Sequence, residues 1–125
     1  MFETVGSREE EAASSDGARV ADISTWLRRL AGEGVGADDA GLVDEIEMLE
    51  RLKSAAAARQ ARLSTVFADS QRAAQRAAGV RSSEVGRGVA GQVGLARHDS
   101  AHKGARHLGL AETLVGEMPA TLAAL

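Results

Sequence analysis

Six basic residues lie close together near the C-terminal end of the sequence, and their types and spacing suit contact with a nucleic acid. On a helix with 3.6 residues per turn, the four basic residues between positions 102 and 107 fall within an arc of about 140°. This arc lies opposite a stripe of apolar residues. A basic helix face of this kind can bind phosphates and read base edges in the major groove of duplex DNA, as helix-turn-helix proteins do. A surface helix is also polar on its outer side, so a solvated face remains the alternative interpretation. The candidates for DNA binding are Arg97, His98, His102, Lys103, Arg106 and His107.

The three histidines in this cluster raise the question of a metal site, and the surrounding sequence argues against one. The chain has no cysteine, and Asp99 is the one carboxylate close to the histidines in sequence. Zinc sites need three or four such ligands in a compact arrangement. We therefore expect no metal and no other cofactor, and we interpret the histidines as surface residues.

Other chemistries find little support in these residues. The basic half of the chain has a single aromatic residue, Phe67, whereas proteins that bind single-stranded nucleic acid stack bases on several aromatic rings. No serine lies in a recognisable nucleophile motif with a basic partner, and no pair of acids stands out as a general acid and base. We therefore expect no catalytic residues and no enzyme activity in this chain.

The composition predicts an all-helical chain with a small-residue core. The 125 residues include 25 alanines, one proline and three aromatic residues, and alanine, leucine, arginine and glutamate all favour helices. The charge is uneven, since residues 1–50 carry 13 acids against four cations (−9), and residues 51–125 carry 11 cations against five acids (+6). This asymmetry fits either an anionic partner for the basic half or two halves that fold onto each other. No apolar run suits a membrane span or a secretory leader, so we expect a cytoplasmic protein without a membrane partner.

The first two predicted segments are a tail and a short helix. Residues 1–17 show no hydrophobic period and predict a disordered acidic tail. Residues 18–31 place apolar side chains at spacings of three and four, which predicts a short amphipathic helix. Glycines at positions 32, 34 and 36 then end this helix. The remaining residues, 18–125 as a whole, are predicted to form one helical region.

A single long helix is predicted over about residues 40–78, ending at Gly79. Along it, a regular alternation of four and three residues resembles the seam of a coiled coil. The seam predicts either a homodimer through the long helix or, as the alternative, packing within the same chain. Its positions are Leu42, Ile46, Leu49, Lys53, Ala56, Gln60, Leu63, Phe67, Ser70 and Ala74.

Two or three shorter helices in a helix-turn-helix-like arrangement are predicted after the long one. Residues 84–97 suggest a helix with Val85, Val89, Gln92 and Ala96 on one face, and their four glycines indicate either a close helix contact or a frayed segment. Ser100 suits an N-cap, and Pro119 suits the first turn of a last helix. Residues 101–116 form the helix between them. Its predicted buried stripe is Ala105, Leu108, Ala111 and Val115.

Residues 40–125 resemble the N-terminal region of a known family. The resemblance rests on LKSAAAARQARL, SQRAAQRAAGV and GRGVAGQVGLAR, and most of all on RHLGLAETLVGEMPATLAAL over residues 106–125. These stretches are similar to the actinobacterial domain-of-unknown-function 222 family, also called thirteen-E-twelve repeat proteins. In that family the region usually precedes an HNH endonuclease domain, which implies a nuclease domain as the missing C-terminal neighbour. The helical character that continues to Leu125 predicts the same continuation.

The resemblance does not extend to nuclease activity. The chain contains no asparagine, so a His-Asn-His nuclease core cannot lie among these residues. No catalytic residue is therefore carried over from the family. The sequence predicts a non-catalytic helical module of an HNH-endonuclease-associated protein with duplex DNA as its candidate partner, and a self-association module without a nucleic-acid role is the alternative.

Overall fold

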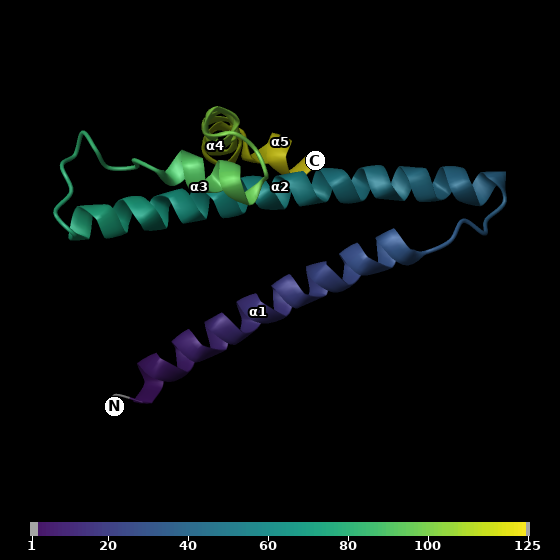
Figure 1. The fold of residues 1–125 in the computed structure, drawn as a ribbon, viewed down its shortest axis with the longest axis horizontal. Coiled ribbons are helices and arrows are strands. Elements are labelled where there is room, and N and C mark those ends of the chain that lie inside the picture. The colour runs from purple at the N-terminus through teal and green to yellow at the C-terminus, as the bar shows by residue number, and fades with distance from the viewer. Residues whose placement is uncertain (1–2, 125) are drawn as a thin grey trace. The chain divides into compact units, whose positions relative to one another are not determined.

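The structure, a computed structural model, describes residues 3–124 and shows helices and connecting turns over that range, with no strand (Figure 1). The all-helical prediction is confirmed, as is the long helix predicted over about residues 40–78. No helix within residues 3–124 combines the length and apolarity that a membrane span requires. The helices are α1 (Glu3–Gly32), α2 (Asp39–Ala77), α3 (Val89–Ala96), α4 (Ala101–Gly116) and α5 (Pro119–Ala124).

The chain divides into two compact units, residues 1–39 and residues 40–125. The boundary between them falls inside the helical region predicted over residues 18–125. The first unit contains α1, and the second contains nearly all of α2 together with the three shorter helices.

Helix α1 is longer than the sequence pattern predicts. It begins at Glu3, so it includes most of the stretch predicted as a disordered tail, whose first two residues lie outside the described range. The Glu- and Ala-rich sequence before Asp16 has high helix propensity and no proline, and helix propensity does not require an apolar face. An ion pair of 3.1 Å between Arg19 and Asp16 adds support across one turn.

The core of the second unit is built on a face of small residues along α2. Its buried positions are spaced by three and four residues, and they are contributed by Ala, Ser and Thr. Ala58 and Ala61 form one cluster with Ala111 of α4. Ala68 forms a second cluster with Val89 of α3 and Leu108 of α4. The complete buried face of α2 consists of Ala58, Ala61, Ser64, Thr65 and Ala68.

The long turn between α2 and α3 differs from the prediction of a helix over residues 84–97. Helix α3 begins only at Val89, because Gly86 and Gly88 adopt φ values of +92° and +84°, which are incompatible with a helix. The side chain of Gln75 on α2 holds this turn: its Oε1 accepts a 2.6 Å hydrogen bond from the Gly86 N–H, and its Nε2 donates to the Arg87 carbonyl at 3.2 Å. Val85, predicted on the helix face, therefore lies in the turn instead.

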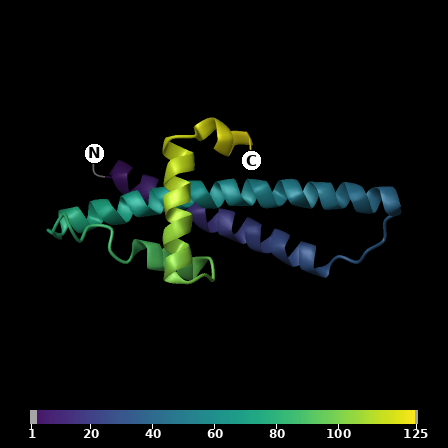
Figure 2. The same cartoon turned by 90° about the horizontal axis from the view of Figure 1, so that it is seen from above.

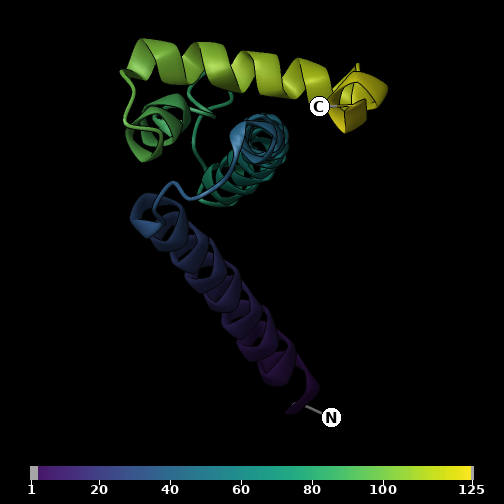
Figure 3. The same ribbon diagram turned by 90° about the vertical axis from the view of Figure 1, so that its right-hand side faces the viewer.

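Helix α4 follows the prediction closely and crosses α2 steeply, as Figures 2 and 3 show. It begins at Ala101, and the Ser100 hydroxyl accepts a 3.2 Å hydrogen bond from the Lys103 N–H, as predicted for an N-cap. Leu108 and Ala111 are buried as predicted, whereas Ala105 is exposed. The physical reason is that Gly104, next to it, makes the close contact with α3.

Helices α3 and α4 approach each other through two glycines. A Cβ atom added at Gly104 would lie 2.3 Å from the Ala90 carbonyl oxygen and 2.8 Å from the Gly94 Cα. A Cβ atom added at Gly94 would lie 2.7 Å from the Ser100 carbonyl oxygen. These distances leave no room for any side chain. Of the two interpretations of the glycines, close helix contact therefore holds for Gly94.

We expect Gly104→Ala to lower the free energy of unfolding by about 1–3 kcal/mol, because the added methyl group forces the two backbones apart. Gly109→Ala is the matched control in the same helix, since nothing lies within 4 Å of the added Cβ atom. It should raise stability by about 0.5–1 kcal/mol through helix propensity. Urea unfolding followed by circular dichroism measures both variants. Equal stability of the two would contradict the close packing of α3 on α4.

Candidate nucleic-acid interface

The six predicted DNA-binding residues are brought together by the helix-turn-helix arrangement of α3 and α4. Arg97 and His98 follow the last residue of α3, and the other four residues lie in the first two turns of α4. The structure divides the six into two groups. Arg97 and His107 are partly buried and bonded to other parts of the unit, whereas His98, His102, Lys103 and Arg106 are exposed.

The buried group forms a polar network that joins three elements. Arg97 pairs with Asp99 at 3.4 Å and also contacts Nδ1 of His107. On the other side of the ring, His107 Nε2 lies 3.0 Å from the Ser64 hydroxyl of α2. The network therefore ties α2 to α4 and to the turn before it, which is a structural role.

The direction of each hydrogen bond in this network follows from its donors. The Ser64 hydroxyl donates to the Gln60 carbonyl oxygen at 2.7 Å, so its oxygen is left to accept from His107 Nε2. A guanidinium can only donate, so Nδ1 of His107 must accept from Arg97. His107 is therefore held as the neutral tautomer that carries its proton on Nε2.

The pairing of Ser64 with His107 was not predicted from the sequence, because 43 residues separate them. A serine beside a histidine resembles a nucleophile with its base, yet the hydrogen bonds here run the opposite way. A catalytic histidine accepts the serine proton on one nitrogen while a carboxylate accepts the proton of the other nitrogen. In His107 the nitrogen that faces Ser64, Nε2, already carries the proton. The other nitrogen, Nδ1, faces Arg97 and not a carboxylate. The pair is thus arranged to stabilise the fold and not to activate Ser64.

Burial lowers the pKa of His107 below its ordinary value of 6.5, and the nearby positive charge of Arg97 lowers it further. Asp99 acts in the opposite direction and raises this pKa. The balance favours the neutral ring, in agreement with the hydrogen-bond directions.

The exposed group lies beside a shallow surface cavity of about 530 Å³. Lys103 and Arg106 line it together with Arg97, and Asp99 is the one carboxylate among its lining residues. Lys103 and Arg106 take part in no ion pair among the described residues. The positive charge that this surface offers to a partner therefore comes mainly from these two side chains.

His98 has a backbone role that the sequence did not reveal. Its φ is +56°, and the Asp99 N–H donates to the Gly94 carbonyl at 2.7 Å to end α3. The His98 N–H donates to the Leu95 carbonyl at 3.1 Å, which completes a Schellman motif with histidine at the position that glycine usually takes. Gly79, with φ of +81°, ends α2 in the same way and was predicted.

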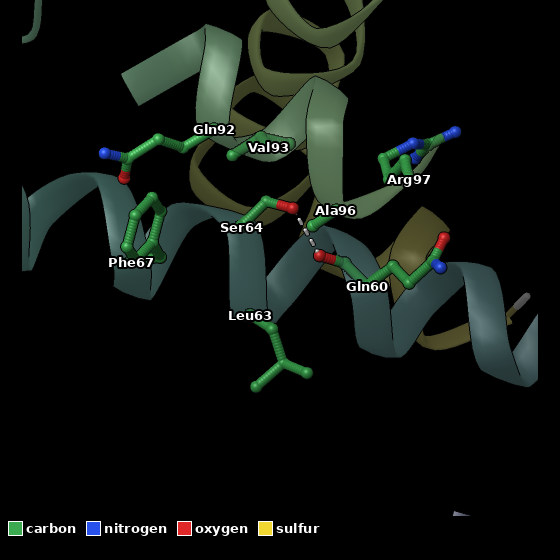
Figure 4. A pocket seen from close by; sticks show the side chains of 8 residues that line it. All are labelled: Gln60, Leu63, Ser64, Phe67, Gln92, Val93, Ala96 and Arg97. Carbon is green, nitrogen blue, oxygen red and sulfur yellow. Dashed lines mark hydrogen bonds between the residues drawn. The ribbon is translucent and has the colours of Figure 1, made fainter. Parts of the chain in front are cut away.

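A second cavity, of about 270 Å³, lies between α2 and α3 (Figure 4). Most of its lining is apolar, with Phe67 and Val93 on its two sides. Figure 4 shows the hydrogen bond from Ser64 to Gln60 beside it and shows Leu63 pointing away from α3. The cavity offers no pair of groups suited to acid–base or nucleophilic chemistry.

No group of three or more histidine, aspartate or glutamate side chains in the described part of the chain could hold a metal ion. Comparison with protein-family models, curated proteins and solved structures finds no significant match to this chain.

We expect the stability of the second unit to fall as the pH drops below about 6.5, the value for an unfolded histidine. Because the folded pKa of His107 is lowered, the unfolded chain takes up a proton first, so acid favours unfolding until the folded pKa is passed. Thermal unfolding between about pH 8 and about pH 5 measures this loss, because these limits lie roughly one unit or more on either side of the pKa of an unfolded histidine.

His107→Gln should be less stable at neutral pH and should lose this part of the pH dependence. His102→Gln is the matched control, since His102 is exposed and lies on the same helix. It should retain the pH dependence of the unmodified chain. Retention of that dependence in His107→Gln would contradict the assignment.

Proposed function

We propose that this chain is a non-catalytic helical interaction module that associates with itself through an apolar surface on α2. The observation that carries the proposal is the distribution of side-chain sizes on that helix. The residues of this helix that are buried in the core are small, whereas most of its large apolar residues are exposed. The exposed large apolar residues of α2 are Val43, Ile46, Met48, Leu49, Leu52, Leu63 and Val66. Four of them, which lie on the side away from the buried face, we name the α2 apolar surface: Leu49, Leu52, Leu63 and Val66. Met48 borders this surface, whereas Val43 and Ile46 lie on the side of the buried face.

The residues of the α2 apolar surface lie on one side of the helix. At 3.6 residues per turn its four side chains fall within an arc of about 100°, centred nearly opposite the buried small-residue face. Their exposed fractions are 37% for Leu49, 49% for Leu52 and Leu63, and 65% for Val66. Leucines repeated along one side of a long helix are typical of helices that pair.

The predicted coiled-coil seam is used only in part within the second unit. Phe67 packs against the cluster around Ala68, whereas Ile46, Leu49 and Leu63 are exposed. Helix α2 packs within its own chain, as one of the two interpretations of the seam predicts, but it does so mainly through its small residues. Because several seam positions stay exposed, association with a second chain, the other interpretation, remains part of the proposal.

The resemblance to the N-terminal region of the domain-of-unknown-function 222 family adds a biological setting. It supports the proposal that the module accompanies an HNH nuclease domain and brings two copies of it together. The reading frame that follows residue 125 in the gene tests this part of the proposal.

We expect the purified chain to sediment as a concentration-dependent dimer and the double variant Leu49→Lys/Leu63→Lys to sediment as a monomer. The two lysines place charges on the α2 apolar surface but touch none of the buried small residues. Burying such charges at an interface has a large cost. Analytical ultracentrifugation at several concentrations measures the change, and circular dichroism reports helix content.

Leu95→Lys is the control, since Leu95 is 77% exposed and lies on α3, away from this surface. It should leave the dimer intact. An unmodified chain that stays monomeric at high micromolar concentration would refute the proposed self-association.

Duplex DNA is the second candidate partner, and the exposed cations of α4 are the observation in its favour. His102, Lys103 and Arg106 lie near the start of that helix, and the two longer side chains have no acidic partner among the described residues. Arg97 and His107 contribute less than the sequence predicted, because Asp99 and Ser64 already bind them. The interface would thus bind phosphates without strong base specificity.

We expect Lys103→Glu/Arg106→Glu to abolish any binding of a fluorescent duplex in an anisotropy titration at low salt, where phosphate contacts are strongest. Arg19→Glu/Arg28→Glu on α1 makes the same change in net charge and should bind like the unmodified chain. If the unmodified chain does not bind duplex DNA even at low salt, the DNA role is wrong and self-association is unaffected.

A further inference from the structure

We propose that protonation of His107 releases Arg97 from its hydrogen bond to the ring, so that acid strengthens the binding of duplex DNA to the exposed cations of α4. This inference rests on the proposed DNA contact and adds its regulation. Three features favour it: the hydrogen bonds of the His107 ring, the position of Asp99, and the place of Arg97 beside the exposed cations.

Both ring nitrogens of His107 are engaged while the ring is neutral. Nε2 donates to the Ser64 oxygen at 3.0 Å, because the Ser64 hydroxyl itself donates to the Gln60 carbonyl. Nδ1 carries no proton and accepts from the guanidinium of Arg97. The hydrogen bond to Arg97 therefore exists only while Nδ1 keeps its lone pair.

Protonation changes one of these two hydrogen bonds and leaves the other intact. A proton enters the ring at Nδ1, since Nε2 already carries one. The ring and the guanidinium of Arg97 are then both donors and both positively charged, so their contact becomes unfavourable. Nε2 remains a donor and keeps its bond to Ser64. His107 therefore stays attached to α2, and Arg97 is the side chain that moves.

Asp99 is the acceptor available to the new N–H group of the ring. It is partly buried, and it lines the cavity of about 530 Å³ together with His107 and Arg97. Its negative charge already raises the pKa of His107, against the effects of burial and of Arg97. Its hydrogen bond to Arg97 Nε is long, at 3.4 Å. The carboxylate can therefore turn from the guanidinium to the protonated ring, which weakens the second bond that holds Arg97.

The other groups that face the ring supply no second carboxylate. Helix α2 contributes Ser64 and Gln60, and neither carries a charge. Helix α4 itself contributes Lys103 and Arg106, which line the same cavity and are cations. Among the described residues that line the two cavities next to the ring, none belongs to α3. One acid, Asp99, is thus shared between the ring and Arg97.

Arg97 lies where it joins the exposed cations once it is released. It lines the same cavity as Lys103 and Arg106. Its side chain is already 30% exposed, so rotation about its own bonds brings the guanidinium into solvent. Release adds a third cation to the two that this surface already offers. The affinity for duplex DNA and its salt dependence both rise with the number of phosphates that cations neutralise.

Anisotropy titrations of a fluorescent duplex at several salt concentrations test the switch, because the slope of log affinity against log salt counts the phosphates contacted. We expect Arg97→Gln to leave this slope nearly unchanged at about pH 8 and to reduce it by about 0.9 once His107 is protonated. NMR signals of the His107 ring in the unbound chain show the pH of protonation, and circular dichroism confirms that the chain is folded there. Exposed histidines gain charge in both chains and cancel in the comparison.

His107→Gln supplies the control background, because the glutamine side-chain oxygen accepts from Arg97 at every pH. In that background Arg97→Gln should change the slope by the same amount at both pH values. A second measurement needs no substitution: the NMR signal of the Arg97 Nε–H in the unmodified chain should shift with the same midpoint as the His107 ring.

A change in slope that is equal at both pH values when His107 is present would overturn this inference while the DNA contact stands. An Arg97 signal that stays fixed while the ring takes up its proton would overturn it as well, as would a chain that unfolds before the ring is protonated. A chain that binds no duplex at either pH would overturn the DNA role together with this inference.

Discussion

The close approach of helices over small side chains is the constraint on which the second unit depends. Ala58, Ala61 and Ala68 on α2 and Gly104 on α4 let backbones come together where a larger side chain would separate them. Small residues bury little apolar area each, so stability must come from many close atomic contacts. No large side chain is fully buried among the described residues, which makes these contacts the main source of cohesion.

This manner of packing leaves most of the large apolar residues of α2 on the outside. A helix that buries Ala58, Ala61 and Ala68 but exposes Leu49, Leu52 and Leu63 reverses the usual arrangement of an amphipathic helix. The hydrophobic effect favours covering the exposed leucines, and a second chain can do so without altering the core. Core formation and the proposed association thus use opposite faces of one helix.

The basic cluster is divided in a similar way between structure and surface. Arg97 and His107 bind inward, to Asp99 and Ser64, and hold α4 in place on α2. Lys103 and Arg106 remain exposed. A run of cations in a sequence therefore overstates the charge available to a partner wherever the fold uses some of them itself.

The sequence by itself determined the features that depend on near neighbours. The limits of α4, its Ser100 cap and the end of α2 at Gly79 follow from interactions across a few residues, and all were predicted. Tertiary structure decided which face of α2 is buried, where α3 begins and which basic residues face inward. Each depends on residues far apart in the chain: Gly104 for the close helix contact, Gln75 for the turn, and Ser64 for His107. Local periodicity reports that a residue is apolar or charged, but the partner that meets it is set by the path of the whole chain.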